Sequence, residues 1–429
     1  MMDRRSFLST STVAAAVAAS PFSILHKRDD QNIKLGLIGA GWYGMVIANA
    51  ALDVGGVEVI SVCDVDSKHL KESLDELEAK QGSRPTGYTQ YLELLEDKEL
   101  DAILIGTQPH WHALQFIASC EKGLDIYCEK PLAYDVDEGK AMVAAAKRAD
   151  NFVQIGFQRR QANSFAKVKT LIAEGDIGDI HQVKAQIHYN PSILDTSPQS
   201  PPAELDWEAW CGPAPKLAYS PSIGHKAWRL EKEYGHGHLV DWGIHHIDII
   251  RHILDLDMPH TFQSSGGIYH LVDKITTADT LQASMIYENC PVQWEHRLWG
   301  TGNMDKEYKN GVFFYGEKGT IFSNDRQFIL QSNAKDAEPE THEIKSDLRV
   351  DHMANFLNAI KAQDKGVISC SIEEGFKSTA VVQLATIAYE TGSQVQWDAQ
   401  SQTVLDNAAA KALLARSYRG DYVRPVIRT

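Results

Sequence analysis

The stretch Ile33-Lys34-Leu35-Gly36-Leu37-Ile38 runs directly into Gly39-Ala40-Gly41-Trp42-Tyr43-Gly44, and it decides the fold. The first half predicts a buried strand, and the pattern that follows to about Leu52 predicts a helix. Gly39 permits a tight turn, Gly41 lets the backbone approach a pyrophosphate, and Gly44 lets the helix pack closely. The helix N-terminus then faces the phosphates. The motif alone is a weak signal, because a doubly wound fold without a cofactor remains the alternative.

Asp64 strengthens the prediction of a dinucleotide site. It follows a second apolar run, Val57–Cys63, and stands about 20 residues after Gly44. An acid at this place accepts hydrogen bonds from the ribose hydroxyls of adenosine and repels a 2′-phosphate. We therefore predict NAD as the cofactor. NADP stays open, because Lys68 is near enough in the sequence to serve a phosphate.

Short apolar runs and helical patterns alternate along the first part of the chain. Further strands are predicted at 102–105, 125–128 and 152–156, and helices at 67–80, 110–122 and 136–149. This rhythm predicts a parallel sheet covered by helices, and we assign residues 31–157 to a Rossmann domain.

The second part of the chain predicts a different sheet. Longer runs with partial alternation cover 180–189, 263–270, 280–287 and 292–299, and helical patterns cover 350–362 and 372–391. They predict an α/β domain over residues 158–400, with a large, mostly antiparallel open sheet. We expect residues 401–429 to pack back on the core. Seven prolines from Pro191 to Pro221 predict an irregular loop over the active site, or else a plain surface excursion.

Three more motifs follow in order along the chain. They are Thr107-x-Pro109-His110-x-His112, Glu129-Lys130-Pro131 and Gly235-x-Gly237-x-x-x-Asp241-x-x-x-His245. Together with Gly39–Gly44 they give residues 31–330 a resemblance to the glucose–fructose oxidoreductase/inositol dehydrogenase (Gfo/Idh/MocA) family. The resemblance implies a Rossmann domain followed by an open-sheet α/β domain, and catalytic roles for Lys130, Asp241 and His245.

The motifs and the resemblance together define a predicted cofactor site. Its residues are Gly39, Gly41, Trp42, Tyr43, Gly44, Asp64, Thr107, Pro109, His110, His112, Glu129, Lys130 and Gln158.

The chemistry of alcohol oxidation fits the predicted catalytic residues. Hydride transfer from a secondary alcohol needs a base at the hydroxyl, and a histidine such as His245 titrates near neutrality. Asp241, four residues earlier, shares a helix face with His245 if a helix starts there. It then contacts substrate hydroxyls, or orients the ring and favours its protonated form. Lys130 stabilises the developing alkoxide charge.

Aromatic and basic residues suggest a carbohydrate substrate. Flat rings cover the apolar faces of sugars while polar groups take the hydroxyls. The candidate substrate residues are Arg159, Tyr189, Trp228, Arg229, His236 and His246. For Trp207, Trp210 and Trp242 we favour ordinary packing. A metal site among the histidines near His236 is the less favoured alternative, so we predict no metal.

The composition excludes several classes of protein. The formal net charge of −15 argues against a nucleic-acid partner, which needs a basic face. The length of 429 residues predicts more than one domain, and six cysteines are too few for a disulfide scaffold.

The first 28 residues predict export. Arg4-Arg5-Ser6-Phe7-Leu8 precedes an Ala/Val run from Val13 to Ala19 that is too short to span a membrane. This order resembles a twin-arginine signal, which is an address and not an anchor. The alternative is a frayed helix with a chance arginine pair. We expect a periplasmic or secreted protein without a stable membrane anchor, exported folded around a tightly held cofactor.

These inferences predict an NAD(P)-dependent oxidoreductase that acts on a secondary hydroxyl of a sugar or glycoside and recycles its bound cofactor. The alternative is an NAD-dependent glycoside hydrolase, in which transient oxidation at C3 permits elimination at C1. That route needs a second base, for which His236, His246 and Tyr189 are candidates. A non-catalytic nucleotide-binding sensor is disfavoured by the intact catalytic residues. The resemblance also implies a homo-oligomer, a dimer or tetramer.

Overall fold

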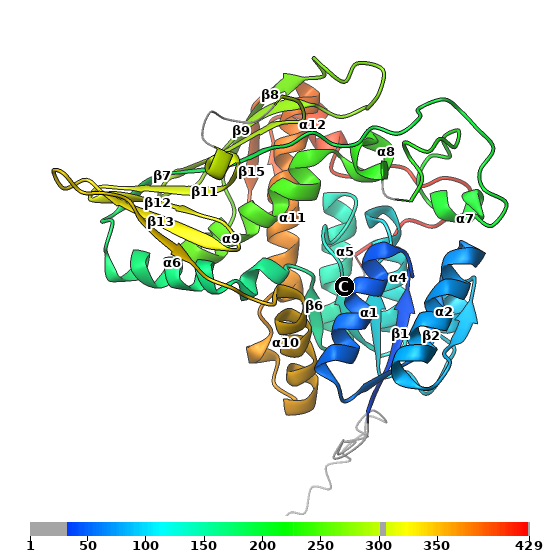
Figure 1. Cartoon of the computed structure of the whole chain (residues 1–429). Coiled ribbons are helices and arrows are strands. Elements are labelled where there is room, and N and C mark those ends of the chain that lie inside the picture. Colours follow the sequence, from blue (N-terminus) through cyan, green and yellow to red (C-terminus); the bar gives the residue numbers. More distant parts are fainter. Residues whose placement is uncertain (1–31, 226, 301–305, 428–429) are drawn as a thin grey trace, which may run out of the picture. The chain divides into compact units, whose positions relative to one another are not determined.

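Two β-sheets organise the chain in a computed structural model that describes residues 32–225, 227–300 and 306–427 (Figure 1). Residues 1–28, where the sequence predicts an export signal, lie outside the described residues. None of the helices in these ranges combines the length and apolar character that crossing a bilayer requires. All six cysteines are buried and unpaired, as expected for a chain that is no disulfide scaffold.

The first sheet has six parallel strands in the order β3-β2-β1-β4-β5-β6. They are β1 (Ile33–Ile38), β2 (Val57–Cys63), β3 (Thr86–Tyr88), β4 (Ala102–Ile105), β5 (Asp125–Cys128) and β6 (Val153–Ile155). The connecting helices are α1 (Trp42–Val54), α2 (Ser67–Gln81), α3 (Tyr91–Leu94), α4 (Pro109–Glu121) and α5 (Val136–Ala149). This is the Rossmann order, in which ligands bind where the strand order reverses, between β1 and β4. Ile38 pairs with Ile105, so the loops after these two strands lie side by side.

The second sheet has ten strands in the order β14-β13-β12-β11-β7-β10-β9-β8-β15-β16. They are β7 (Ile180–His188), β8 (Thr261–Gly267), β9 (Thr280–Ile286), β10 (Pro291–Arg297), β11 (Asn310–Gly316), β12 (Gly319–Ser323), β13 (Gln327–Ser332), β14 (Glu340–Glu343), β15 (Val395–Asp398) and β16 (Thr403–Leu405). Only β7 and β10 pair in parallel among these described strands. The predicted fold class, a Rossmann domain plus an open and mostly antiparallel sheet, is therefore confirmed.

Helices cover one face of the second sheet (Figure 1). Those of the second part of the chain are α6 (Asn163–Glu174), α7 (Trp207–Cys211), α8 (Lys232–Gly235), α9 (Ile244–Leu254), α10 (Leu348–Ala362), α11 (Ile372–Thr391) and α12 (Ala408–Ala412). The long helix α11 is apolar around most of its circumference, which is typical of a buried helix. It packs on β8 and on α5, and its Thr379 accepts a hydrogen bond from the backbone of Leu132, in the loop between β5 and α5. The two sheets are therefore joined through one shared helix.

Helix α10 completes the Rossmann domain although it comes late in the sequence. Its side chains Met353, Phe356 and Leu357 are buried in the same apolar cluster as Leu35 and Leu37 of β1. The predicted boundary at residue 157 therefore separates the strands of the two sheets, whereas the cores on either side are built from both parts of the chain.

Candidate active site

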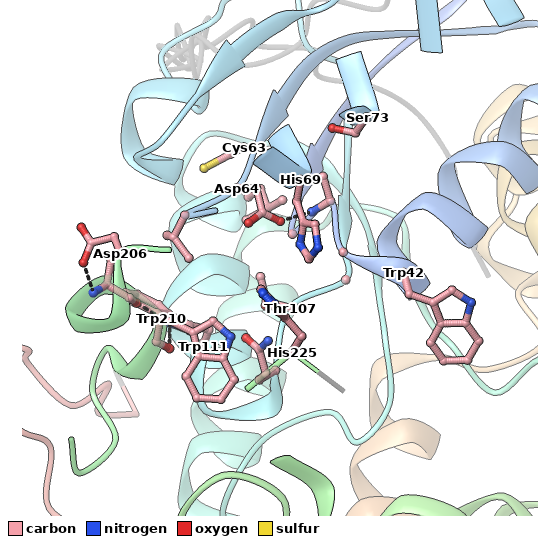
Figure 2. A pocket seen from close by; sticks show the side chains of 18 of the residues that line it. Trp42, Cys63, Asp64, His69, Ser73, Thr107, Trp111, Asp206, Trp210 and His225 are labelled. Atoms are coloured by element: carbon pink, nitrogen blue, oxygen red, sulfur yellow. Dashed lines mark hydrogen bonds between the residues drawn. The ribbon is translucent and has the colours of Figure 1, made fainter. Parts of the chain in front are cut away.

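A cavity of about 990 Å³ lies along the carboxyl edge of the Rossmann sheet. It begins at the loop Gly39–Gly41, passes Asp64 at the end of β2, and reaches Thr107 after β4. Figure 2 shows these side chains around one hollow. The volume lies in the range of small-molecule and cofactor pockets, 300–1,000 Å³ in general. It coincides with the reversal of strand order, where a dinucleotide would bind.

Glycine is favoured at each of the three motif positions for a different structural reason. Gly39 adopts a φ of +87°, and Gly44 packs so closely that a Cβ there would lie 1.7 Å from the carbonyl oxygen of Gly39. Gly41 precedes the first residue of α1, and no atom lies within 4 Å of the position where its Cβ would be. A helix N-terminus with this open space beside it fits the pyrophosphate of a dinucleotide. The residues present therefore fit the predicted cofactor.

Asp64 is held in a fixed orientation at the edge of this cavity. Its Oδ2 accepts a hydrogen bond from the backbone of Ala40 at 2.7 Å, and its Oδ1 accepts one from Asp66 at 2.8 Å. Each carboxylate oxygen can accept a further bond, so the side chain can still receive ribose hydroxyls.

The charges around the cavity favour NAD over NADP. Among the described residues that line it there are five acidic side chains, Asp64, Glu72, Glu76, Asp206 and Glu208, and no lysine or arginine. Lys68, which the sequence left open as a phosphate ligand, is exposed and lies 3.9 Å from Glu72. A 2′-phosphate would meet negative charge here, with no lysine or arginine among the described lining residues to bind it.

Two residues predicted to bind the cofactor, His110 and His112, instead form hydrogen bonds with backbone carbonyl groups of neighbouring segments. His110 and His112 are completely buried, and His112 bonds the carbonyls of Thr107 and Pro131 at 3.0 and 2.9 Å. His110 bonds the carbonyl of Trp210 at 3.0 Å, and burial lowers its pKa to about 3. A direct cofactor contact does not agree with this burial, so these two predictions are corrected. Pro109, also buried, begins α4.

Other predicted cofactor residues lie in and behind the wall of the site. Trp42 lines the large cavity and is half exposed, whereas Tyr43 accepts a hydrogen bond from Gln158 at 2.7 Å. Glu129 is buried, and this burial raises its pKa to about 7 although the charge of Lys130 opposes the shift. The sequence analysis did not predict Gln108, Trp111 and Gln115, which line the cavity together with Thr107.

Lys130, Asp241 and Arg229 form a charged cluster where the two parts of the chain meet. The Nζ of Lys130 donates to the carbonyl of Asp241 at 2.7 Å and to its Oδ1 at 3.1 Å. The Nε of Arg229 donates to the same Oδ1 at 3.1 Å. Burial alone would raise the pKa of Asp241, but the two cations outweigh it and lower the pKa to about 2. Two of the three predicted catalytic residues are thus in contact, although they lie far apart in the sequence.

The third predicted catalytic residue, His245, is buried near this cluster. Its ring lies between Phe157 and Trp242, with centroids 6.4 and 6.2 Å away, and its Nδ1 is buried without a hydrogen-bond partner. Burial lowers the pKa of His245 well below its usual value, and the charges of Lys130 and Arg159 act in the same direction. The imidazole is therefore neutral at neutral pH, the form that accepts a proton.

The expected relation between Asp241 and His245 is wrong in one respect. Asp241 lies in a π-helical turn, Leu239–Gly243, and His245 in the α-helix α9 that follows, so they do not share one regular helix. The carboxylate of Asp241 is directed to Lys130 and Arg229. It does not raise the pKa of His245, which contradicts the expectation that it favours the protonated ring.

A smaller cavity, of about 170 Å³, adjoins Asp241. The predicted substrate residues Tyr189 and Arg229 line it, together with Lys274 and His238. His238 is buried with an unpartnered Nε2, and the ring of Tyr189 lies 5.0 Å from it. Sequence reasoning named His238 only as part of a metal site. The signal that could have identified His238 as a cavity residue is its position directly after the Gly235-x-Gly237 turn.

Three other predicted substrate residues lie against protein instead. His246 is completely buried, which rules out direct substrate contact, and it bonds Arg159 at 3.2 Å. His236 adopts a φ of +56° and bonds the carbonyl of Tyr134 at 3.0 Å. This left-handed backbone conformation favours glycine, so a histidine is unusual at this position. Arg159 itself is buried over the ring of Trp242.

Trp228 is the remaining correction among the predicted substrate residues. It is buried in a cluster with Trp207, Trp210 and Tyr234, and the guanidinium of Arg229 lies 4.5 Å from its ring. It therefore supports Arg229 and does not offer a face to a sugar. For Trp207 and Trp210 the packing interpretation agrees with their burial.

Late segments of the chain close the outer side of the large cavity. Three of its lining residues, Leu194, Tyr219 and His225, come from residues 191–225, here called the proline-rich segment. Tyr422 comes from residues 413–424, here called the C-terminal segment. The proline-rich segment is fastened to the first residue of α2 and to the loop after β2 by backbone hydrogen bonds from Ser67 to Glu204 at 2.9 Å and from Asp206 to Val65 at 3.1 Å. The predicted irregular loop thus lies over the candidate cofactor cavity.

The C-terminal segment is fastened to the other parts by charged contacts. Arg416 lies 3.3 Å from the ring of Tyr134 and donates to the carbonyl of Glu233. Arg424 pairs with Asp135, at the start of α5, through two hydrogen bonds. Residues 413–424 therefore hold α5 and α8 together beside the large cavity.

The fold and the cavity define a two-domain protein built around a dinucleotide site. Residues 33–157 match the description "Oxidoreductase family, NAD-binding Rossmann fold", and residues 192–424 match "Oxidoreductase family, C-terminal alpha/beta domain". The chain therefore belongs to the Gfo/Idh/MocA oxidoreductase family. The predictions of the family and of an NAD cofactor are confirmed.

Two individual relatives match parts of the chain in sequence. The inositol 2-dehydrogenase of Salmonella typhimurium is 32% identical over 166 residues, which is 38% of this chain and 47% of that protein. The chain thus spans about half the length of this relative. The myo-inositol 2-dehydrogenase of Thermotoga maritima is 24% identical over 297 residues, 68% of this chain and 75% of that protein.

A solved structure extends the likeness over most of the chain. A levoglucosan dehydrogenase, in complex with NADH and levoglucosan, superposes with a TM-score of 0.68 at 20% identity, covering 85% of this chain and 99% of that one. Because only 20% of the residues are identical, this similarity shows a shared fold alone.

Proposed function

We propose that the chain is an NAD-dependent oxidoreductase that acts on a secondary hydroxyl of a sugar or glycoside and retains its cofactor between turnovers. The observation that carries the proposal is the contact of Lys130 with Asp241 beside a polar cavity. A lysine, a carboxylate and a neutral buried histidine are the groups that alcohol oxidation requires. The inositol and levoglucosan dehydrogenases among the relatives support a polyol or sugar as the substrate class.

The residues divide the chemical work between them. When bound, NAD supplies the acceptor for the hydride. Neutral His245 takes the proton of the substrate hydroxyl, and Lys130 stabilises the negative charge that develops on the oxygen. Asp241 holds Lys130 and Arg229 in place through its two charged hydrogen bonds and keeps their charges compensated in a poorly solvated site.

Retention of the cofactor is supported by the late segments of the chain that line the outer side of the cavity. A dinucleotide in the large cavity would be covered by the proline-rich segment and by Tyr422. The proposal predicts that purified protein contains NAD without any addition. Denaturing desalted protein and measuring the released nicotinamide tests this, and a preparation that neither contains nor binds NAD would overturn it.

A direct test of the catalysis uses Lys130→Ala. With a suitable sugar, wild-type protein should develop the absorbance of reduced nicotinamide, and Lys130→Ala should lose this signal while still containing NAD. Lys365→Ala, which removes an exposed lysine paired with Asp150, is the matched control and should behave as wild type. Equal signals from wild type and Lys130→Ala would contradict the assigned role.

Glycoside cleavage through transient oxidation is the second candidate function. It is favoured by the unpartnered Nε2 of His238, which borders the same small cavity as Asp241 and Tyr189. The neutral imidazole of His238 can act as the additional base at C2, whereas burial raises the pKa of Tyr189 and keeps its phenol protonated. Aryl glycosides separate the two functions, because phenol release without net redox change indicates cleavage, whereas a keto-sugar product indicates oxidation.

We also propose export through the twin-arginine route and assembly into a homo-oligomer. Export rests on Arg4-Arg5 and the apolar run after it. Replacing both arginines by lysine should leave the protein in the cell, and unchanged export would contradict the route. Assembly is supported by a polar hollow on the second sheet, lined by Lys184, Gln293 and Glu295. Light scattering of the purified protein measures it.

A further inference from the structure

Three potential metal ligands converge at the rim of the large cavity. Asp66 and His69 belong to the start of α2, and His225 belongs to the proline-rich segment from the second part of the chain. Each offers one ligand atom, and all three atoms lie within 4.8 Å of one another. Figure 2 shows His69 and His225 near Asp64. This group is separate from the histidines around Asp241 that the sequence had suggested for a metal.

The carboxylate of Asp66 is already oriented for a ligand. Its Oδ1 accepts hydrogen bonds from the backbone of Lys68 at 2.9 Å and of His69 at 3.0 Å, which caps α2. Its Oδ2 lies 3.3 Å from the Nε2 of His225. Only 4% of Asp66 is exposed, so the capping bonds hold the carboxylate in one position. Such bonds to a ligating carboxylate are what outer-shell partners provide at metal sites.

The spacing agrees with a tetrahedral ion of zinc type. Zinc binds histidine nitrogen and carboxylate oxygen at about 2.0–2.2 Å, so two ligands of a tetrahedral ion lie about 3.3–3.6 Å apart. The distance between Asp66 and His225 lies within this range. The rings of His69 and His225 have centroids 4.4 Å apart with a tilt of 49°, so a small rotation of His69 brings its nitrogen to the third position.

We propose that Asp66, His69 and His225 bind one divalent transition-metal ion, with Zn²⁺ as the preferred class. Two imidazoles and one carboxylate are a borderline donor set that suits zinc and excludes calcium or magnesium as the preferred ion. The fourth position faces the large cavity, which both histidines line, and is filled by water.

The ion would join the two parts of the chain. His225 lies beyond the backbone contacts that fasten residues 204–206 to the loop between β2 and α2 and to the start of α2, so a metal bond adds a second attachment point for the same segment. With the proposed function, this attachment slows release of the cofactor. Zinc binding itself does not depend on the proposed function, whereas the effect on the cofactor does.

Zinc binding is measured on tag-free protein, because a histidine tag would bind the metal. After dialysis against a chelator, titration calorimetry with Zn²⁺ alone should give one ion per chain. His225→Ala and His69→Gln should weaken binding by more than the roughly 10- to 100-fold that loss of an outer-shell partner costs. Asp66→Asn keeps a capping oxygen and should weaken it too. His181→Ala, an exposed histidine beside Glu317, is the matched control.

Two outcomes decide the proposal. Absence of stoichiometric zinc binding, or equal binding by wild type, His225→Ala and His69→Gln, would leave only a hydrogen bond between Asp66 and His225 and overturn the site. Binding of Co²⁺ with the visible spectrum of a tetrahedral ion supports it. If zinc binds as expected but does not slow the release of NAD relative to chelator-treated protein, the attachment role is wrong while the metal site stands.

Discussion

The replacement Asp241→Asn tests how the charged cluster is held together. Asparagine has nearly the same shape as aspartate but no charge, so Lys130 and Arg229 would remain in a poorly solvated place without their common partner. The side chains of Lys130 and Asp241 are only 13% and 12% exposed. Removing one partner from a buried ion pair costs more than removing one from a surface pair.

The size of the effect follows from the pKa of Asp241. Its value of about 2, against the ordinary 3.8, corresponds to about 2–3 kcal/mol. Because burial alone would raise this pKa, the attraction to the two cations is larger than this net figure. The folded chain keeps the carboxylate charged to about pH 2, whereas the unfolded chain protonates it near pH 3.8. The stabilisation is therefore present above about pH 4 and is lost as the pH falls toward 2.

Urea unfolding at pH 7 measures the effect on chains that are free of cofactor. We expect Asp241→Asn to lower the free energy of unfolding by about 2–3 kcal/mol. Asp150→Asn is the matched control, because Asp150 is 91% exposed in its pair with Lys365 and such pairs contribute about 0–1 kcal/mol. A loss for Asp241→Asn no larger than that of the control would refute this account of the cluster.

Three further predictions concern the cofactor and the base. Gly41→Ala should leave unfolding unchanged but lower the NAD content, because its Cβ would enter open space at a φ of −66°, whereas Gly44→Ala should destabilise the fold by its clash with Gly39. Thermal unfolding and released nicotinamide distinguish the two variants, and equal behaviour would contradict this assignment. Asp64→Ser should weaken NAD binding by about 1.5–3 kcal/mol, the worth of a charged hydrogen bond, without gaining NADP binding, as titration of both nucleotides would show. The pH profile of kcat/KM should have no acid limb near pH 6.5, because the pKa of His245 lies well below that value, and a limb there would speak against His245 as the neutral base.

Local patterns predicted the Rossmann strands closely. The run Val57–Cys63 became β2 with the same bounds, and Ile33–Ile38 became β1. Buried parallel strands are short apolar runs between turn residues, so their limits are visible in the sequence. Strand β3 of the Rossmann sheet and strands β11 to β16 of the second sheet were missed. Among them, β14 is exposed along its whole length and β16 is only three residues long, so neither leaves an apolar pattern to read.

The motifs predicted which residues are candidates for catalysis, but they did not predict the contacts between them. Lys130 and Asp241 meet only because helix α11 joins the two sheets, and no local pattern carries that information. The same reason explains the errors at His110, His246 and Trp228. Each is a polar or aromatic residue beside a real motif, and only the tertiary packing shows that its side chain is enclosed by protein.

Because residues 413–424 come near the end of the chain, their contacts can form only after the other parts of the cavity lining have been synthesised. Arg416 and Arg424 fasten segments that leave the ribosome hundreds of residues earlier, including Tyr134 and Asp135. While translation proceeds, the Rossmann strands are complete but the outer wall of the cavity is still missing Tyr422. The lining of the cavity is therefore completed only when Tyr422, near the end of the chain, has been synthesised.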